Sequence, residues 1–369
     1  MPLKYIVEYS VDQTTWDELF NIESISAFVG KSGLTDTFEP SRATIVMRYP
    51  DGFTSPNDDL VVGTWIRFQQ TGGMGSEMWR GQIRNVNVDW GKPFRNGVGA
   101  ADFMTIECEG ALAQWGRLQG NGTVVSAGTL QAQVTAVAAI GSLTWGASFP
   151  TGTYPDMAAS VVDNSLLNWV NTAAATTGSF VLDGSGILGL YTKDFIGTLP
   201  VSFSDVTASA TVQNYDGLTF DSLAQDYFTQ VQVDMNSGTV VTRETGAEPY
   251  RTLRLSTFSA STAQATDLAD WLLGVYSRAS FGISEVTTVA ASQATTDFDL
   301  GNPFYALPGN RTTLVFRGTT YTLTILGVSF TANAQESRFT YSVIDADLTP
   351  YLYLDSPTYG ILDTNRLNW

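Results

Sequence analysis

Three pairs of closely spaced aspartates are the residues whose type and spacing could carry out chemistry. They are Asp58 with Asp59, Asp297 with Asp299, and Asp345 with Asp347. Paired carboxylates can hydrolyse a glycosidic bond or supply oxygen ligands to a hard cation. None of the pairs has the spacing of a calcium-binding loop, and each lies beside turn residues such as Pro56 or Pro350. The pattern favours acids at turns and strand ends over a catalytic or metal site.

A glycine-rich segment, Gly184 to Gly189, fits the G-x-G-x-x-G pattern and follows a strand-like stretch. A dinucleotide site requires a helix to begin at that turn, so that the helix N-terminus faces the pyrophosphate. The chain instead continues from Leu190 with the pattern of a second strand. Because Asp183-Gly184 is a typical hairpin turn, we predict a β-hairpin here and no bound cofactor.

The residues that the sequence lacks restrict the remaining chemistry. The chain contains no histidine and one cysteine, Cys108, in a strand-like segment. Ser-His-Asp and Cys-His catalysis, imidazole-based zinc sites and an intrachain disulfide are therefore excluded. The nine tryptophans offer stacking platforms for sugars, but in a β-rich chain they are more simply core or interface residues. We expect no enzyme activity, no cofactor and no metal.

The composition indicates a surface that neighbouring subunits cover rather than one that grips nucleic acid. Charged residues make up 15% of the 369 residues, against about 25% in an average soluble domain. The formal net charge is −17, whereas nucleic-acid affinity depends on clustered Lys and Arg. An acidic surface favours solubility and also lets nucleic acid pass without binding. The N-terminus has no apolar signal core, and no segment approaches the roughly 20 apolar residues of a membrane span.

Hydrophobic periodicity divides the chain into β-rich ends and a mixed middle. Alternating apolar residues predict strands up to residue 117 and again from about 280 to 345. Helical spacing predicts a helix at 163–176 with Asp163 as its N-cap, another at 219–228, and a third at 262–278. Ser261 and Gln264 fit a capping box for the third helix. These elements predict a mainly β chain with a few helices, a β-rich α+β fold.

A strand-turn-strand signature occurs near both ends of the chain. The first copy begins at Gly63 and the second at Gly301. Both carry Ile-x-x-Val-x-(Val or Phe), at Ile83/Val86/Val88 and Ile325/Val328/Phe330. We interpret the copies as two related small β-barrels, with a chance likeness between two ordinary β-meanders as the alternative. A duplicated chain of this kind is typical of a scaffold.

The order of these elements resembles that of phage tail-tip proteins of the baseplate-hub type, the minor tail proteins of long, non-contractile tails. Four stretches carry the resemblance, namely Trp79-Arg-Gly-Gln-Ile with 105–113, the helix from Asn164 with 178–188, the helix at 263–278 with 286–289, and the ending 359–369. The resemblance implies tail-tube-like barrels at 1–117 and 201–348, an α+β insert at 118–200, and an aromatic tail at 349–369.

Hubs of this family form rings of three copies, whose six barrels match a hexameric tail tube. The implied partners are a homotrimer, tail tube and distal tail proteins, and tip or fibre proteins, at the distal end of a virion tail. DNA would only pass through an acidic lumen. We expect the tail to contact a partner through an apolar set, with self-packing as the alternative: Tyr351, Tyr353, Tyr359, Leu362 and Trp369.

Two other functions stay open at the level of sequence. One is a distal tail or tail tube protein, which would form a hexamer from one barrel per chain. The other is a carbohydrate-binding or carbohydrate-cleaving β protein that uses its tryptophans and carboxylates. The pattern also leaves open whether segment 198–240 belongs to either barrel or to the insert.

Overall fold

The computed structural model confirms a mainly β chain with a few helices. It describes residues 5–33, 36–49, 59–70, 77–90, 102–141, 147–148, 154–183, 188–191, 202–206, 212–221, 227–246, 249–276, 282–291 and 309–345. Most of these residues lie in strands, and the largest sheet contains strands from both ends of the chain.

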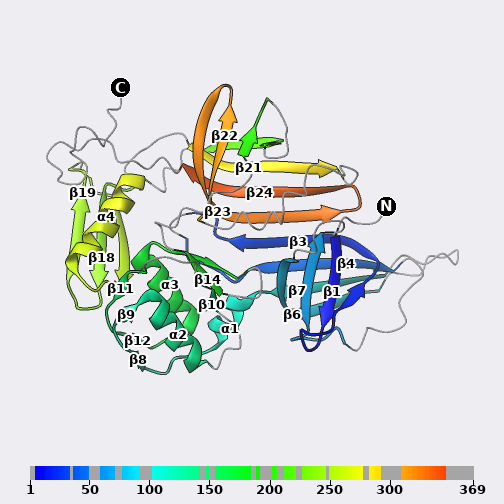
Figure 1. The fold of residues 1–369 in the computed structure, drawn as a ribbon, viewed down its shortest axis with the longest axis horizontal. Helices are drawn as coiled ribbons and strands as arrows, with labels where there is room; N and C mark the ends of the chain where they lie inside the picture. The colour runs from blue at the N-terminus through cyan, green and yellow to red at the C-terminus, as the bar shows by residue number, and fades with distance from the viewer. Residues whose placement is uncertain are drawn as a thin grey trace.

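Eight strands of that sheet form a continuous layer, which we call the wide layer. Their order is β6-β7-β4-β3-β23-β24-β21-β17, and every neighbouring pair is antiparallel. Figure 1 shows β21, β24, β23 and β3 side by side. The strands are β3 (Ile22–Gly30), β4 (Arg42–Tyr49), β6 (Glu77–Asp89), β7 (Asp102–Glu109), β17 (Gly217–Asp221), β21 (Gly282–Ala291), β23 (Thr319–Asn333) and β24 (Glu336–Asp345).

The sheet curls back over the wide layer in both halves of the chain. From β6 it continues through β5 (Trp65–Gln70) and β1 (Tyr5–Ser10) to β2 (Asp17–Leu19). From β23 it continues through β22 (Arg311–Phe316) and β15 (Ser202–Ser204) to β16 (Val212–Asn214). The strand pairs among the described residues close no barrel, so each half of the chain is a curled sheet with a buried apolar face.

The segment between the two curled sheets folds around its own core. Its helices bury apolar stripes against short strand pairs, with Trp115, Leu130 and Val170 fully buried. The elements are α1 (Ala111–Arg117), β8 (Thr123–Val125), β9 (Gly128–Thr129), α2 (Leu130–Ile140), β10 (Ala147–Ser148), β11 (Asp156–Met157), β12 (Ser160–Val162), α3 (Leu166–Thr177), β13 (Phe180–Leu182) and β14 (Leu188–Tyr191). We call this unit the insert.

A second small unit lies beside the insert, at the left of Figure 1. Helix α4 (Thr262–Tyr276) packs on the three-stranded sheet of β18 (Gln230–Met235), β19 (Val240–Glu244) and β20 (Thr252–Thr257). Segment 198–240, whose membership the sequence left open, is thus divided. Its strands β15, β16 and β17 join the large sheet, and β18 joins this small unit.

Two predicted helices are confirmed, and one is wrong. One half of the predicted capping box of α4 is present, because Ser261 Oγ accepts from Gln264 N at 3.2 Å, whereas Gln264 Oε1 accepts at 2.8 Å from Ala260 N, one residue before the cap. Helix α3 begins later than predicted, with Ser165 rather than Asp163 as its N-cap. The predicted helix at 219–228 is instead strand β17 as far as Asp221, because Leu218 and Phe220 alternate and pair with β21.

Candidate assembly surfaces

The duplicated signature corresponds to two strand triplets of the same geometry, β5-β6-β7 and β22-β23-β24. In each triplet the long middle strand pairs first with the preceding strand and then with the following one. The register shifts within the predicted motif, between Ile83 and Asn85 in β6 and between Ile325 and Gly327 in β23. A bulge bends a strand, so the shift lets one strand serve two layers.

The same glycine turn precedes the outer strand of each triplet. Gly63 and Gly309 both have a φ of 96°, and each donates its N–H to the motif isoleucine, to Ile83 O at 2.9 Å and to Ile325 O at 2.7 Å. The isoleucine N–H groups donate in turn to Thr64 O at 2.8 Å and Asn310 O at 3.0 Å. The counterpart of Gly63 is therefore Gly309, whereas the predicted Gly301 lies outside the described residues. A positive φ favours glycine, which explains why both copies keep it.

The correspondence extends beyond the triplets to six strands in each half. In the first half, neighbouring strands pair in the order β3-β4-β7-β6-β5-β1. In the second half they pair in the order β17-β21-β24-β23-β22-β15, so each strand of one half has a counterpart with the same neighbours in the other. One pair differs in direction, because β1 runs antiparallel to β5 and β15 runs parallel to β22. The second half also carries the unit of β18 to α4 between β17 and β21. The two halves are two versions of one strand topology.

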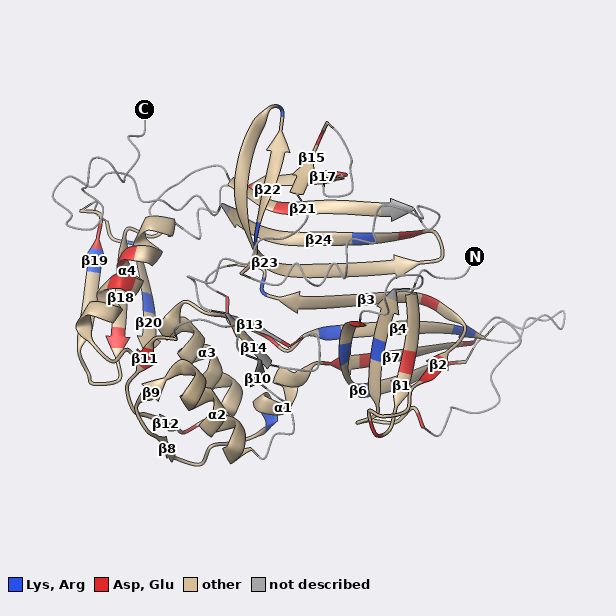
Figure 2. Ribbon diagram, in the orientation of Figure 1, with Lys and Arg blue, Asp and Glu red and all other residues tan. Residues whose placement is uncertain are grey.

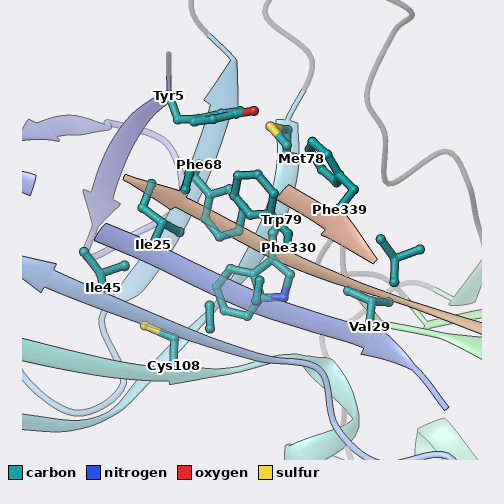
Figure 3. Close-up of a cluster of buried hydrophobic side chains, with 14 of the residues drawn as sticks. Tyr5, Ile25, Val29, Ile45, Phe68, Met78, Trp79, Cys108, Phe330 and Phe339 are labelled. Carbon is teal, nitrogen blue, oxygen red and sulfur yellow. The ribbon is translucent and has the colours of Figure 1, made fainter. Parts of the chain in front are cut away.

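The halves meet where β3 pairs with β23, and a shared aromatic core lies beneath this junction (Figure 3). The Phe330 ring lies 5.0 Å from Tyr5, 6.0 Å from Phe68 and 4.8 Å from Phe339, measured between ring centroids. Phe68 also stacks on Trp79 at 5.5 Å. Because Phe330 and Phe68 belong to different halves and are fully buried, the junction is part of the core.

The other face of the wide layer carries hydroxyl groups along its middle strands and charged residues, such as Arg48 and Glu285, on the strands beside them. Thr287 and Thr340 face each other across β21 and β24 with their hydroxyl oxygens 3.2 Å apart. Figure 2 shows few charged positions along β3 and β23. Charges at the ends of this face occur in pairs, such as Arg84 with Glu107 at 3.6 Å. The net charge of −17 is thus not concentrated along β3 and β23, and these two strands offer little for a phosphate to bind.

Asp183, at the end of β13, joins the insert to the wide layer. Its carboxylate is 2% exposed and accepts the Ser41 N–H on both oxygens and the Leu112 N–H on Oδ2, each at 3.0 Å. Burial raises its pKa from 3.8 to about 6, against the lowering effect of these hydrogen bonds. Gly110 lies against the carboxylate, since an added Cβ there would be 2.6 Å from Oδ2. The sequence suggested only a hairpin turn for this aspartate.

A cavity of about 130 Å³ lies where the wide layer, the insert and the α4 unit meet. Leu255 and Trp271 line it together with Lys31, which is 8% exposed. Burial lowers the pKa of Lys31 to about 8, although Asp36 favours its charged form, and the Nζ atom lies 4.5 Å from the centre of the Phe38 ring. The apolar lining and the cation–π contact explain how this lysine is accommodated.

The predicted sites have mixed outcomes. The predicted hairpin around the Gly184 to Gly189 segment is confirmed by the described residues on either side, because β13 and β14 pair antiparallel and Leu188–Tyr191 is a strand. Of the aspartate pairs, Asp58, Asp297, Asp299 and Asp347 lie outside the described residues, and so do the predicted contact residues Tyr351, Tyr353, Tyr359, Leu362 and Trp369.

The described residues contain no group of three or more acidic, cysteine or histidine side chains placed to hold a metal ion. Among the same residues, none of the helices combines the length and the apolar character needed to cross a bilayer.

Solved structures of phage origin share this architecture. The 43 kDa tail protein of prophage MuSo2 from Shewanella oneidensis has a TM-score of 0.65 at 11% identity, over 93% of this chain and 99% of that one. This is the fold of phage tail proteins. The tail protein from Neisseria meningitidis MC58 has a TM-score of 0.64 at 10% identity, over 93% of this chain and 96% of that one. The prophage tail protein gp18 from Listeria monocytogenes has a TM-score of 0.52 at 10% identity, over 91% of this chain and 94% of that one. No protein-family model and no curated protein matches the sequence.

Proposed function

We propose that this chain is a structural protein of a phage or phage-like tail and forms a homotrimeric hub at the distal end of the tail. The observation that carries the proposal is the duplication of one strand topology, down to the shared bulge and glycine turn. Three copies would present six related curled sheets around one axis. Such a ring matches the symmetry of a hexameric tube on one side and of threefold tip proteins on the other.

The likeness to solved tail proteins supports this proposal at the level of the fold, because it covers nearly all of both chains. The expected partners are therefore the tail tube, distal tail proteins and tip or fibre proteins. The hub acts by binding and positioning these proteins, without catalysis. The hydroxyl groups along β3 and β23 suit a channel wall, because water can solvate them and few charged positions lie along these strands to bind phosphates.

The native mass of the purified chain, measured over a range of concentrations, tests the proposal. The expected species is three times the 39.9 kDa of one chain. A hexamer would favour a distal tail or tube protein, in which one chain supplies one position of a sixfold ring. A monomer at all concentrations would contradict the hub.

A further inference from the structure

We infer that the groove between strand β20 and helix α3 binds segment 351–354 of the chain's own C-terminal tail as an added strand. The groove belongs to a single copy of the chain, so the inference does not depend on the proposed ring. It gives the start of the tail a binding site within the chain, where the sequence left open contact with a partner or self-packing.

The site consists of two adjoining hollows. The cavity of about 130 Å³ described above shares Phe38, Ala175 and Leu255 with a groove of about 430 Å³. Leu167 of α3 and Ser256 of β20 also line the groove, so these two elements form its walls. Figure 2 shows β20 on the side of the α4 unit that faces the insert. We call the cavity and the groove together the hollow.

Apolar side chains around the hollow are incompletely buried. Helix α4 packs across β18 and β19, whereas β20 lies against α3. Leu253 and Leu255 alternate with exposed residues along β20 and are only partly buried, and so is Trp271 of α4. All three side chains line the cavity. An apolar segment in the hollow would take them out of water, which is favourable.

Strand β20 also has an edge with no strand beside it among the described residues. From Thr252 to Thr257 it pairs with β18 only. Beyond the strand, the chain is attached to the insert, because Phe258 N donates to Thr176 Oγ1 at 2.8 Å. The edge that lines the groove can therefore pair with an extended segment, in the way that peptides add to the edge of a sheet.

The last described strand ends near the hollow. Strand β24 ends at Asp345, which pairs with Leu323 of β23. Leu326 is three residues, or about 10 Å, further along β23. Its carbonyl oxygen accepts the N–H of Lys31 at 3.0 Å, and Lys31 lines the cavity. Tyr351 follows Asp345 by six residues, which span roughly 20 Å when extended, so the start of the tail is within reach of the hollow.

The sequence of the tail segment suits a strand that is covered on both faces. Residues 351–354 read Tyr-Leu-Tyr-Leu, between Pro350 and Asp355. Because side chains alternate along a strand, one pair would enter the cavity and the other pair would lie along the groove. A second copy or another protein would have to bring such a segment from further away. The chain's own tail is therefore the occupant that we assign.

Photocrosslinking in the full chain tests this occupant. Ser256→Cys places an exposed thiol at the groove, where a benzophenone label is attached. The natural Cys108 is 3% exposed and does not compete for the label. Light should link the label to the tail peptide within one chain. Mass spectrometry identifies the linked peptide, and a denaturing gel shows whether the link joins one chain or two.

A matched control places the label at the other edge of the same small sheet. Val240 in β19 and Ser256 in β20 both lie opposite Asp234 of β18, and Val240 is 49% exposed. The label on Val240→Cys should give at least tenfold less link to the tail than the label on Ser256→Cys, because Val240 does not line the hollow.

A third variant separates binding of the tail from its nearness to the groove. It combines Ser256→Cys with four substitutions that remove the apolar side chains of the segment: Tyr351→Ser, Leu352→Ser, Tyr353→Ser and Leu354→Ser. The four residues lie outside the described cores, and thermal melting checks that the variant is folded. The link to the tail should fall at least tenfold, since the segment has lost the side chains that the hollow buries.

Each outcome decides the assignment. A link within one chain that forms from Ser256 and is lost with the four serines supports it. An equal yield from Val240, or an equal yield with the serines, shows a tail that only passes near the groove and overturns it. A link between two chains gives the groove to a second copy, and the absence of any link to the tail gives it to another protein. Both results overturn the inference, whereas the native mass of the unlabelled chain tests the ring separately.

Discussion

Replacement of Asp183 by asparagine tests the account of how the insert is anchored to the wide layer. The variant keeps the shape of the side chain but has no proton to exchange. Burial outweighs three hydrogen bonds in setting the pKa of this carboxyl group, which is raised from 3.8 to about 6. Between these values the folded chain holds a proton that the unfolded chain has released.

The sign of the pH effect follows from this difference. Because the folded state binds more protons, the free energy of unfolding falls as pH rises, by about 1.4 kcal/mol for each unit of difference in pKa. The stabilising contribution of Asp183 to the free energy of unfolding is fully present below pH 3.8 and is lost as pH rises through about 6. The whole effect is about 3 kcal/mol, of which roughly 1.4 kcal/mol falls between pH 5 and pH 8. This window avoids the isoelectric point of about 4.2.

Denaturant unfolding of the natural chain and of Asp183→Asn at several pH values in this window measures the effect. We expect the difference between their free energies of unfolding to change by about 1.4 kcal/mol, with the natural chain losing stability relative to the variant as pH rises. Asp156→Asn, at an exposed aspartate of the insert, serves as the control and should give a curve parallel to the natural one. Parallel curves for Asp183→Asn, or a natural chain that gains stability relative to this variant as pH rises, would refute the claim that burial dominates.

Three further predictions follow from burial and capping. Phe330→Ala should lower the free energy of unfolding by about 3 to 5 kcal/mol, because the ring is fully buried at the junction of the halves, whereas Phe20→Ala, at a ring 66% exposed, should cost little. Ser165→Ala should lower the free energy of unfolding by about 1 kcal/mol because it removes the N-cap of α3, whereas Asp163→Ala should lower it much less. If thermal melting shows the larger loss for Asp163→Ala, then Asp163 is the N-cap. Burial raises the pKa of the Cys108 thiol far above its usual range, so the folded chain should resist alkylation that proceeds in denaturant.

The features that could be predicted from sequence are those that depend on neighbouring residues. Alternation predicted the strand with Cys108, and helical spacing with Ser261 and Gln264 predicted α4. The repeated isoleucine motif located the two bulged strands, because both copies keep the same apolar positions around the bulge. Each of these signals lies within about a dozen residues of chain.

The missed features depend on contacts between distant segments. β17 has a helix-like apolar spacing around Thr219, and only pairing with β21 makes it a strand. Gly309 could not be chosen over Gly301 until the hydrogen bond to Ile325 was known. Asp183 has a turn signature, and its role depends on the backbone of Ser41 and Leu112, far away in sequence. For such residues the local pattern carries no information about the partner.

Electron microscopy of the purified chain, with class averages calculated without imposed symmetry, tests the central claim most directly. The account predicts rings with threefold symmetry, six similar densities around the rim and an open centre. Compact particles without a central opening, or rings with six identical subunits, would contradict a trimeric hub built from one duplicated chain.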